Sequence, residues 1–147
     1  MKKILPILFA AVLATAFFLY ASHAQMPEKG SKNTMTLPNG DVIWDLNADW
    51  DSYEEHYGAW SEFGPDSPIL RIKQTGNLLE VTRLTACRWL PEGSIAFLGE
   101  LDKNGCVRGT SPTSLGLLLD IKGQVSEDGS RIVIDDGVKC RMTYTRK

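Results

Sequence analysis

Turn-forming residues divide most of this chain into short, regular intervals, and that spacing is the strongest constraint on its fold. From Asp41 to the end of the chain, clusters of Gly, Asn, Asp, Ser and Pro recur, about every eight to twelve residues. No amphipathic helical pattern longer than about two turns lies between them. Short strands joined by tight turns fit this pattern, so we expect an all-β chain.

The hydrophobic segments between the turns predict eight strands. The dipeptides Asn104-Gly105 and Asp136-Gly137 mark two of the hairpins, because Asn-Gly and Asp-Gly supply the positive φ angles of two-residue loops. The segment between residues 50 and 63 is expected to be irregular, with a possible helical turn. The expected strands cover residues 42–50, 69–74, 78–87, 94–101, 106–110, 115–125, 131–135 and 138–146.

Eight strands linked by short turns favour an antiparallel up-and-down barrel, because closure removes both sheet edges. A two-sheet β-sandwich is the alternative. Strand 78–87 does not alternate cleanly, which indicates a β-bulge or a strand covered on both faces. Alternation in the other strands predicts an inner face made of Ile95, Phe97, Leu101, Leu115, Leu117, Leu119, Ile121, Ile132, Ile134, Val138, Met142 and Tyr144.

The N-terminal residues have the pattern of a secretory signal peptide. Lys2 and Lys3 precede an apolar run over residues 4–20, and small residues lead to an expected cleavage after Ala24. A retained membrane anchor is the alternative. We expect a signal peptide at 1–24, a flexible segment at 25–40 and a barrel domain at 41–147, located in the periplasm or secreted.

The formal net charge gives no support for nucleic-acid binding. It is -2 for the whole chain, and removing Lys2 and Lys3 would make it -4. A chain without a basic patch does not attract nucleic acid over long distances. Nucleic acid is therefore not an expected partner.

Three cysteines, Cys87, Cys106 and Cys140, leave at least one thiol outside any intramolecular bridge. None has the C-x-x-C spacing of zinc or thioredoxin-like sites. In a meander, Cys87 and Cys140 belong to one end of the barrel and Cys106 to the other. We therefore expect a Cys87–Cys140 disulfide with Cys106 free, the alternative being three reduced thiols.

Aromatic and acidic side chains are concentrated between Trp44 and Asp66. Aromatic rings edged by carboxylates hold sugars, cations and flat apolar ligands. The expected ligand-binding residues are Tyr53, Tyr57 and Trp60, with Trp89 from a later loop.

Metal and acid–base chemistry lack complete motifs in the same stretch. Asp45, Asn47 and Asp49 begin like a calcium loop, but Trp50 and His56 stand where an EF-hand needs glycine and glutamate. His56 is interpreted as a solvated loop residue without a nucleophile motif beside it. We expect no metal site, no cofactor and no catalytic residue.

Three segments resemble small secreted bacterial lipocalin-like domains: Trp50 with its approach at 45–47, residues 69–77, and residues 123–134. The resemblance covers about residues 41–147 and implies a calycin-type barrel. In the wider group, an arginine of the last strand stacks over a tryptophan of the first. By similarity, Trp50, or alternatively Trp44, would meet Arg146 or Arg141, with Trp50 and Arg146 as the expected pair.

These observations predict a non-catalytic barrel that binds a small apolar or amphipathic molecule, as a monomer or weak dimer with no membrane association after signal cleavage. One alternative is a protein-interaction module, such as a secreted inhibitor or an envelope accessory protein, whose partner is another envelope protein. A second is a hydrolase that uses the carboxylates of Asp51, Glu54 and Glu55.

Overall fold

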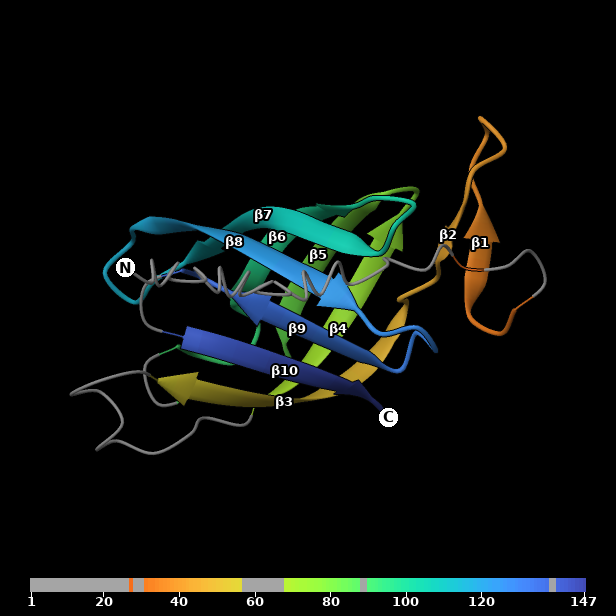
Figure 1. Ribbon diagram of the computed structural model, residues 1–147. Coiled ribbons are helices and arrows are strands. Elements are labelled where there is room, and N and C mark those ends of the chain that lie inside the picture. The colour runs from red at the N-terminus through yellow and green to blue at the C-terminus, as the bar shows by residue number, and fades with distance from the viewer. Residues whose placement is uncertain (1–26, 28–30, 57–67, 88–89, 138–139) are drawn as a thin grey trace, which may run out of the picture.

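The computed structural model describes residues 27, 31–56, 68–87, 90–137 and 140–147, and these form β-strands without a helix. A small sheet of two strands, β1 and β2, precedes a larger sheet of eight (Figure 1). The strands are β1 Thr34–Thr36, β2 Val42–Trp44, β3 Ala48–His56, β4 Ile69–Thr75, β5 Leu78–Arg83, β6 Ile95–Leu101, β7 Cys106–Pro112, β8 Leu118–Val125, β9 Arg131–Asp135 and β10 Cys140–Arg146.

Strands β3 to β10 form a closed antiparallel barrel, in which each strand pairs with the next along the chain and β10 returns to pair with β3. The predicted up-and-down barrel is therefore confirmed, and the sandwich alternative is not adopted. Closure leaves none of these eight strands with an unpaired edge. β1 and β2 lie beyond one end of the barrel (Figure 1).

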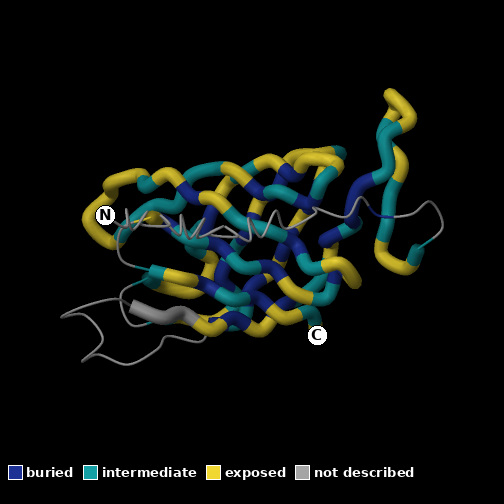
Figure 2. The backbone as a smooth tube through the Cα atoms, in the orientation of Figure 1, coloured by how far each residue is buried: buried dark blue, intermediate teal, exposed yellow. Residues whose placement is uncertain are grey.

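Buried and exposed residues alternate along β4 and β5, and Figure 2 colours the backbone by this burial. Trp50, Phe97 and Tyr144 are the largest fully buried side chains. The rings of Phe97 and Tyr144 stack with centroids 6.0 Å apart and planes 7° from parallel. Aromatic pairs in this range add stability beyond their buried area, so this stacked pair contributes to the stability of the core.

Two inward-facing glycines let β6 and β7 approach closely. A Cβ atom on Gly109 would lie 2.0 Å from the Leu98 carbonyl oxygen, and one on Gly99 would lie 2.7 Å from the Arg108 carbonyl oxygen. Both distances are shorter than any real Cβ contact. Glycine is therefore required at both positions.

The predicted strand 42–50 is two strands, β2 and β3, separated at residues 45–47. The Asp45 carboxylate accepts a hydrogen bond from the Asn47 backbone N–H at 3.0 Å, an Asx turn that interrupts the ladder. β3 then continues to His56, through part of the segment expected to be irregular. β1 lies within the segment expected to be flexible and pairs with β2.

Leu115 and Leu117, predicted to face inward, are exposed. They belong to the turn between β7 and β8, where the Thr113 N–H donates to the Leu117 carbonyl at 2.8 Å and Gly116 has φ +78°. β8 begins only after this turn, so the alternation there is not that of a strand. Val138 lies outside the described residues.

The predicted irregularity in strand 78–87 is a β-bulge between β5 and β6. Val81 pairs with Phe97 and Thr82 pairs with Ile95, so the extra residue is Ala96 on β6. The bulge puts Ala96 and Phe97 both in the buried core. Ile95, predicted to face inward, is only half-buried.

The turn between β8 and β9 contains a carboxylate held by serine hydroxyls. The Ser126 hydroxyl donates to Asp128 at 2.6 Å, and the Ser130 hydroxyl donates to both Asp128 oxygens at 2.7 and 2.8 Å. These hydrogen bonds, joined by one from the Ser130 backbone N–H, lower the pKa of Asp128 from 3.8 to about 2. Hydrogen bonds to the ionised form have this effect.

Between pH 3.8 and about 2, we therefore expect Asp128 to be ionised in the folded chain and mostly protonated in the unfolded chain. Its contribution to stability is present above pH 3.8 and is lost as the pH falls through about 2. Carboxyl ¹³C chemical shifts followed against pH measure the folded value directly. Asp128→Asn should remove this part of the acid dependence of unfolding, and titration of Asp128 at its ordinary pKa would contradict the expectation.

Candidate functional site

The barrel has one closed end. We name the opposite end the open end; residues 57–67, 88–89 and 138–139, which connect strands there, lie outside the described residues. At the closed end, where β3 begins and β10 ends, Ile43, Trp44 and Leu46 are buried against the barrel. A Cβ atom on Gly129 would lie 2.7 Å from the Trp44 ring, so Trp44 packs directly on the β8–β9 turn. The residues at and after β2 therefore seal this end.

Gln74, buried at the closed end, joins these residues to the barrel. Its Oε1 accepts from the Leu46 backbone N–H at 2.7 Å, and its Nε2 donates to the carbonyls of Trp44 at 3.0 Å and Gly76 at 2.9 Å. The Asn47 side chain accepts from the Gln74 backbone N–H at 2.8 Å. The seal is thus held by directed hydrogen bonds as well as by apolar packing.

The pair expected from the resemblance, Trp50 and Arg146, is present beneath this seal. Arg146 Cζ lies 4.8 Å from the Trp50 ring centroid, within range of a cation–π interaction. Trp50 Nε1 donates to the Leu46 carbonyl at 3.1 Å, and Arg146 donates to the Asp45 carbonyl. Both side chains therefore connect the barrel to residues 45–46.

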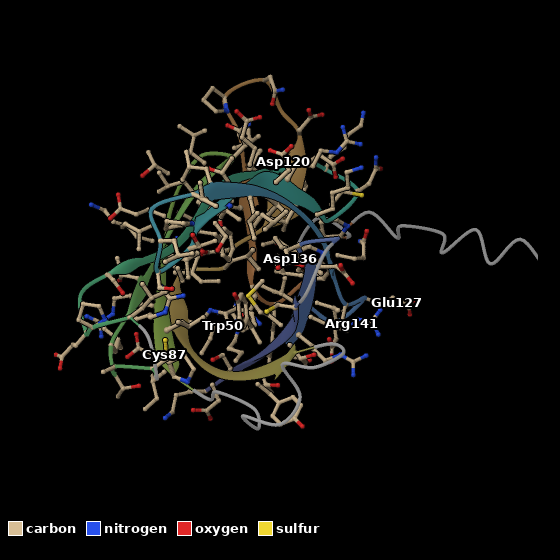
Figure 3. All side chains as sticks on the ribbon, turned by 90° about the vertical axis from the view of Figure 1, so that its left-hand side faces the viewer. Trp50, Cys87, Asp120, Glu127, Asp136 and Arg141 are labelled. Carbon is tan, nitrogen blue, oxygen red and sulfur yellow. The ribbon has the colours of Figure 1, made fainter. Side chains whose placement is uncertain are left out.

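At the open end, where β3 ends and β10 begins, small and polar residues occupy several inward positions. Figure 3 looks into this end, with Trp50 inside the ring of strands. Residues two apart in a strand share a face, so the buried residues of each strand identify its inward positions. The inward residues that are small or polar here are Ser52, Arg83, Ala96, Ser111, Asp136 and Cys140.

Arg83, the last residue of β5, is the cationic member of this set. It shares the inward face with Leu79 and Val81 and is only 4% exposed. Its Nη1 donates to the Ile95 carbonyl at 2.7 Å and contacts the Ser94 hydroxyl at 3.4 Å. Its Nε is buried and has no hydrogen-bond partner among the described residues.

The β-bulge supplies the acceptor for Arg83. The shift in pairing at Ile95 and Ala96 interrupts the β5–β6 ladder, and bulges often redirect groups next to functional sites. The neighbouring Ala96 carbonyl accepts from the Ser111 hydroxyl at 2.8 Å. Carbonyls of two consecutive residues at the bulge therefore accept hydrogen bonds from side chains of β5 and β7.

Asp136 lies on the wall opposite Arg83. In the closed order of eight strands, β9 is four strands from β5, and Asp136 directly follows β9. Asp136 is 9% exposed and accepts from the Cys140 backbone N–H at 2.9 Å. Within the described residues no ion pair joins Arg83 to a carboxylate.

Of the four residues of the predicted aromatic site, the structure describes only Tyr53, so the site stays a prediction. Tyr53 is 46% exposed on β3 and is two residues from exposed Asp51, so it lies on the outer face of the barrel. Tyr57, Trp60 and Trp89 lie outside the described residues, as do the side chains of Glu54, Glu55 and His56.

Two nearby carboxylates, Asp49 and Asp51, form surface ion pairs. Asp49 binds Arg71 through two hydrogen bonds, at 2.8 and 2.9 Å, and hydrogen bonding to Arg71 lowers the pKa of Asp49. Asp51 lies 3.2 Å from Lys147 Nζ. Exposed ion pairs of this kind contribute little to stability.

The predicted Cys87–Cys140 disulfide is not formed, and neither cysteine nor Cys106 is disulfide-bonded. Turn alternation places Cys87 and Cys140 at the same end, but three strand-to-strand steps of about 4.8 Å separate β5 from β10. A disulfide needs Cα atoms within about 7 Å. Figure 3 shows Cys87 and Arg141, the neighbour of Cys140, on different sides of the ring.

Cys106 lies away from the open end, at the start of β7. Its thiol contacts the Gln124 side-chain oxygen at 3.2 Å. Burial, with a smaller effect from Asp102, raises the pKa of this thiol. The thiol is therefore protonated and weakly nucleophilic at neutral pH.

The part of the chain that the structure describes contains neither a metal site nor a membrane-spanning helix. No group of three His, Cys, Asp or Glu side chains there is arranged to hold a metal ion. No helix there is long and apolar enough to span a membrane.

Arg83 is the residue of the open end that sequence reasoning missed. The signal was available, because placing Leu79 and Val81 on the inner face puts Arg83 there as well. The inward position of Arg83 was overlooked because Leu78 and Leu84, which have the opposite parity, suggested a second apolar face of the strand. In the structure Leu78 is exposed and Leu84 is half-buried.

Comparison with protein-family models, curated proteins and solved structures finds no match to this chain. The candidate site therefore rests on the geometry of the barrel alone.

Proposed function

We propose that this protein is a non-catalytic binding barrel of lipocalin-like type, in the periplasm or secreted, whose open end takes one small amphipathic molecule. The difference between the two barrel ends is the observation that carries the proposal. One end is sealed by Trp44 and its neighbours, whereas the inward positions of the other include small and polar residues. Ligands bind in the mouths of such barrels.

The size of the ligand is limited by the core. The stacked rings of Phe97 and Tyr144 fill the middle of the barrel, and an eight-stranded barrel holds one small ligand at most. Binding is therefore expected between this ring pair and the open end. Leu119 and Met142 add apolar surface to the inward positions there.

Substitutions of two adjacent residues on β8 test whether the ligand binds inside the open end of the barrel. Leu119 has the inward parity of buried Ile121, whereas Leu118 is 68% exposed on the outer face. The neutral fluorescent probe N-phenylnaphthylamine should bind wild type at one saturable site. Leu119→Trp should abolish binding by filling the mouth, and Leu118→Trp should retain it.

Circular dichroism establishes that both variants are folded, and native mass spectrometry of the exported full chain reports any copurified molecule. Equal probe binding by wild type and both variants, or no binding by wild type, would overturn the proposal.

One observation favours the alternative of a protein-interaction module. The β7–β8 turn and the start of β8 expose three leucines, Leu115, Leu117 and Leu118, and interface cores are often apolar. A stoichiometric complex with an envelope protein, seen in native mass spectra and lost in Leu115→Ser/Leu117→Ser, would support this function.

A further inference from the structure

The geometry points to Arg83 as the anchor for an anionic headgroup, so that the ligand of the open end is a small amphipathic carboxylate or an anion of similar shape. This inference rests on the proposed function and names its ligand class. It starts from the buried guanidinium of Arg83, which has no carboxylate partner within the described residues.

A buried charge without a counter-charge is energetically unfavourable in a protein interior. Among the described residues, the Arg83 side chain donates only to neutral groups, the Ile95 carbonyl and the Ser94 hydroxyl, and both hydrogen bonds come from Nη1. These contacts satisfy part of the guanidinium's hydrogen-bonding capacity but do not neutralise its charge. A bound anion would neutralise it.

Another arginine of this chain shows which edge of the guanidinium would take the anion. Arg71 holds both carboxylate oxygens of Asp49 through Nε and Nη2, at 2.8 and 2.9 Å. In Arg83 the Nε of that same edge is buried without a partner. The planar fork matches carboxylate and related oxyanions, so the open edge of Arg83 suits such a group.

Arg146 also has a buried Nε without a partner, but its surroundings are different. Its guanidinium lies over the Trp50 ring and donates to the Asp45 carbonyl at the sealed end of the barrel. Arg83 lies at the end of β5 that leads to the open end. Of these two cations, Arg83 is therefore the one that lies at the end of the barrel where we propose that the ligand binds.

Two fluorescent probes that differ by one anionic group test the inference. Anilinonaphthalene sulfonate has the rings of N-phenylnaphthylamine and an added sulfonate. Wild type should bind the sulfonate at least about tenfold more tightly, because hydrogen bonds to charged groups are the strong ones. Arg83→Met should remove this preference and leave the affinity for the neutral probe within about threefold.

Arg108→Met is the matched control, because Arg108 is exposed on the outer face of β7. It should keep the preference for the sulfonate. Arg83→Lys keeps the charge but lacks the planar fork, so its preference should be intermediate. If Arg83→Met does not fold, two measurements still test the inference. They are the ratio of the wild-type affinities for the sulfonate probe and the neutral probe, and the same ratio in Arg83→Lys.

The outcomes separate the inference from the proposed function. Failure of wild type to bind either probe would overturn the proposed function and the inference with it. Binding of the neutral probe without preference for the sulfonate would overturn the inference alone. Equal losses for both probes in Arg83→Met would also overturn it, because Arg83 would then act only by holding the β6 bulge.

Discussion

Replacing Trp50 with alanine is expected to cost about 3 to 5 kcal/mol of unfolding free energy, as large aromatic truncations in cores do. The side chain is fully buried, its ring lies under the Arg146 guanidinium, and its Nε1 donates to the Leu46 carbonyl. Small domains are stable by only about 5 to 15 kcal/mol. The variant should therefore be close to unfolding at room temperature.

Urea denaturation followed by circular dichroism measures this loss without relying on tryptophan fluorescence. Tyr53→Ala is the control on the same strand, because Tyr53 is exposed on the outer face, and it should cost less than about 1 kcal/mol. Trp50→Phe keeps most of the ring but loses the hydrogen bond to Leu46, so it should fall between the two. Similar costs for Trp50→Ala and Tyr53→Ala would contradict the assignment of Trp50 to the core.

Gln74→Leu is expected to cost about 2 to 4 kcal/mol, because each buried group left without a partner costs about 1 to 3 kcal/mol. Leucine has a similar size but cannot accept from the Leu46 N–H or donate to the Trp44 and Gly76 carbonyls. The loss should be concentrated at the closed end. Amide hydrogen exchange should accelerate first in residues 34–46.

Gln74→Glu provides a second test, since it retains an acceptor for Leu46 but has no N–H for the two carbonyls. Lys73→Leu is the control, because Lys73 is the exposed neighbour on β4, and it should change stability by less than about 0.5 kcal/mol. Unchanged exchange in residues 34–46 of Gln74→Leu would show that Gln74 does not hold the seal.

The order of strands was predictable because the turns are encoded locally. Gly105 and Gly129 have positive φ angles, 76° and 69°, and glycine marks such positions in the sequence. Arg131–Asp135 was predicted with its exact bounds. Each of these features depends on residues that are close together in the chain.

Features that depend on distant residues were not predictable in this way. The seal requires Gln74 to bond residues 28 and 30 positions earlier, and no local pattern indicates that pairing. Turn alternation places Cys87 and Cys140 at one end of the barrel but does not give their positions around its circumference. The inward orientation of Arg83 follows from the alternation of Leu79 and Val81, but Leu78 and Leu84 suggest a second apolar face in the sequence.

The pairing of β3 with β10 has a consequence for folding kinetics. Its partners run from His56 and Cys140 to Trp50 and Arg146, so nearly the whole barrel sequence lies between the two strands that meet. The entropy of closing so long a loop is lost before the contacts form, which makes such topologies fold in about milliseconds to seconds. Until then β3 and β10 each lack one neighbour, and the exposed edges give a newly made chain its greatest opportunity to aggregate.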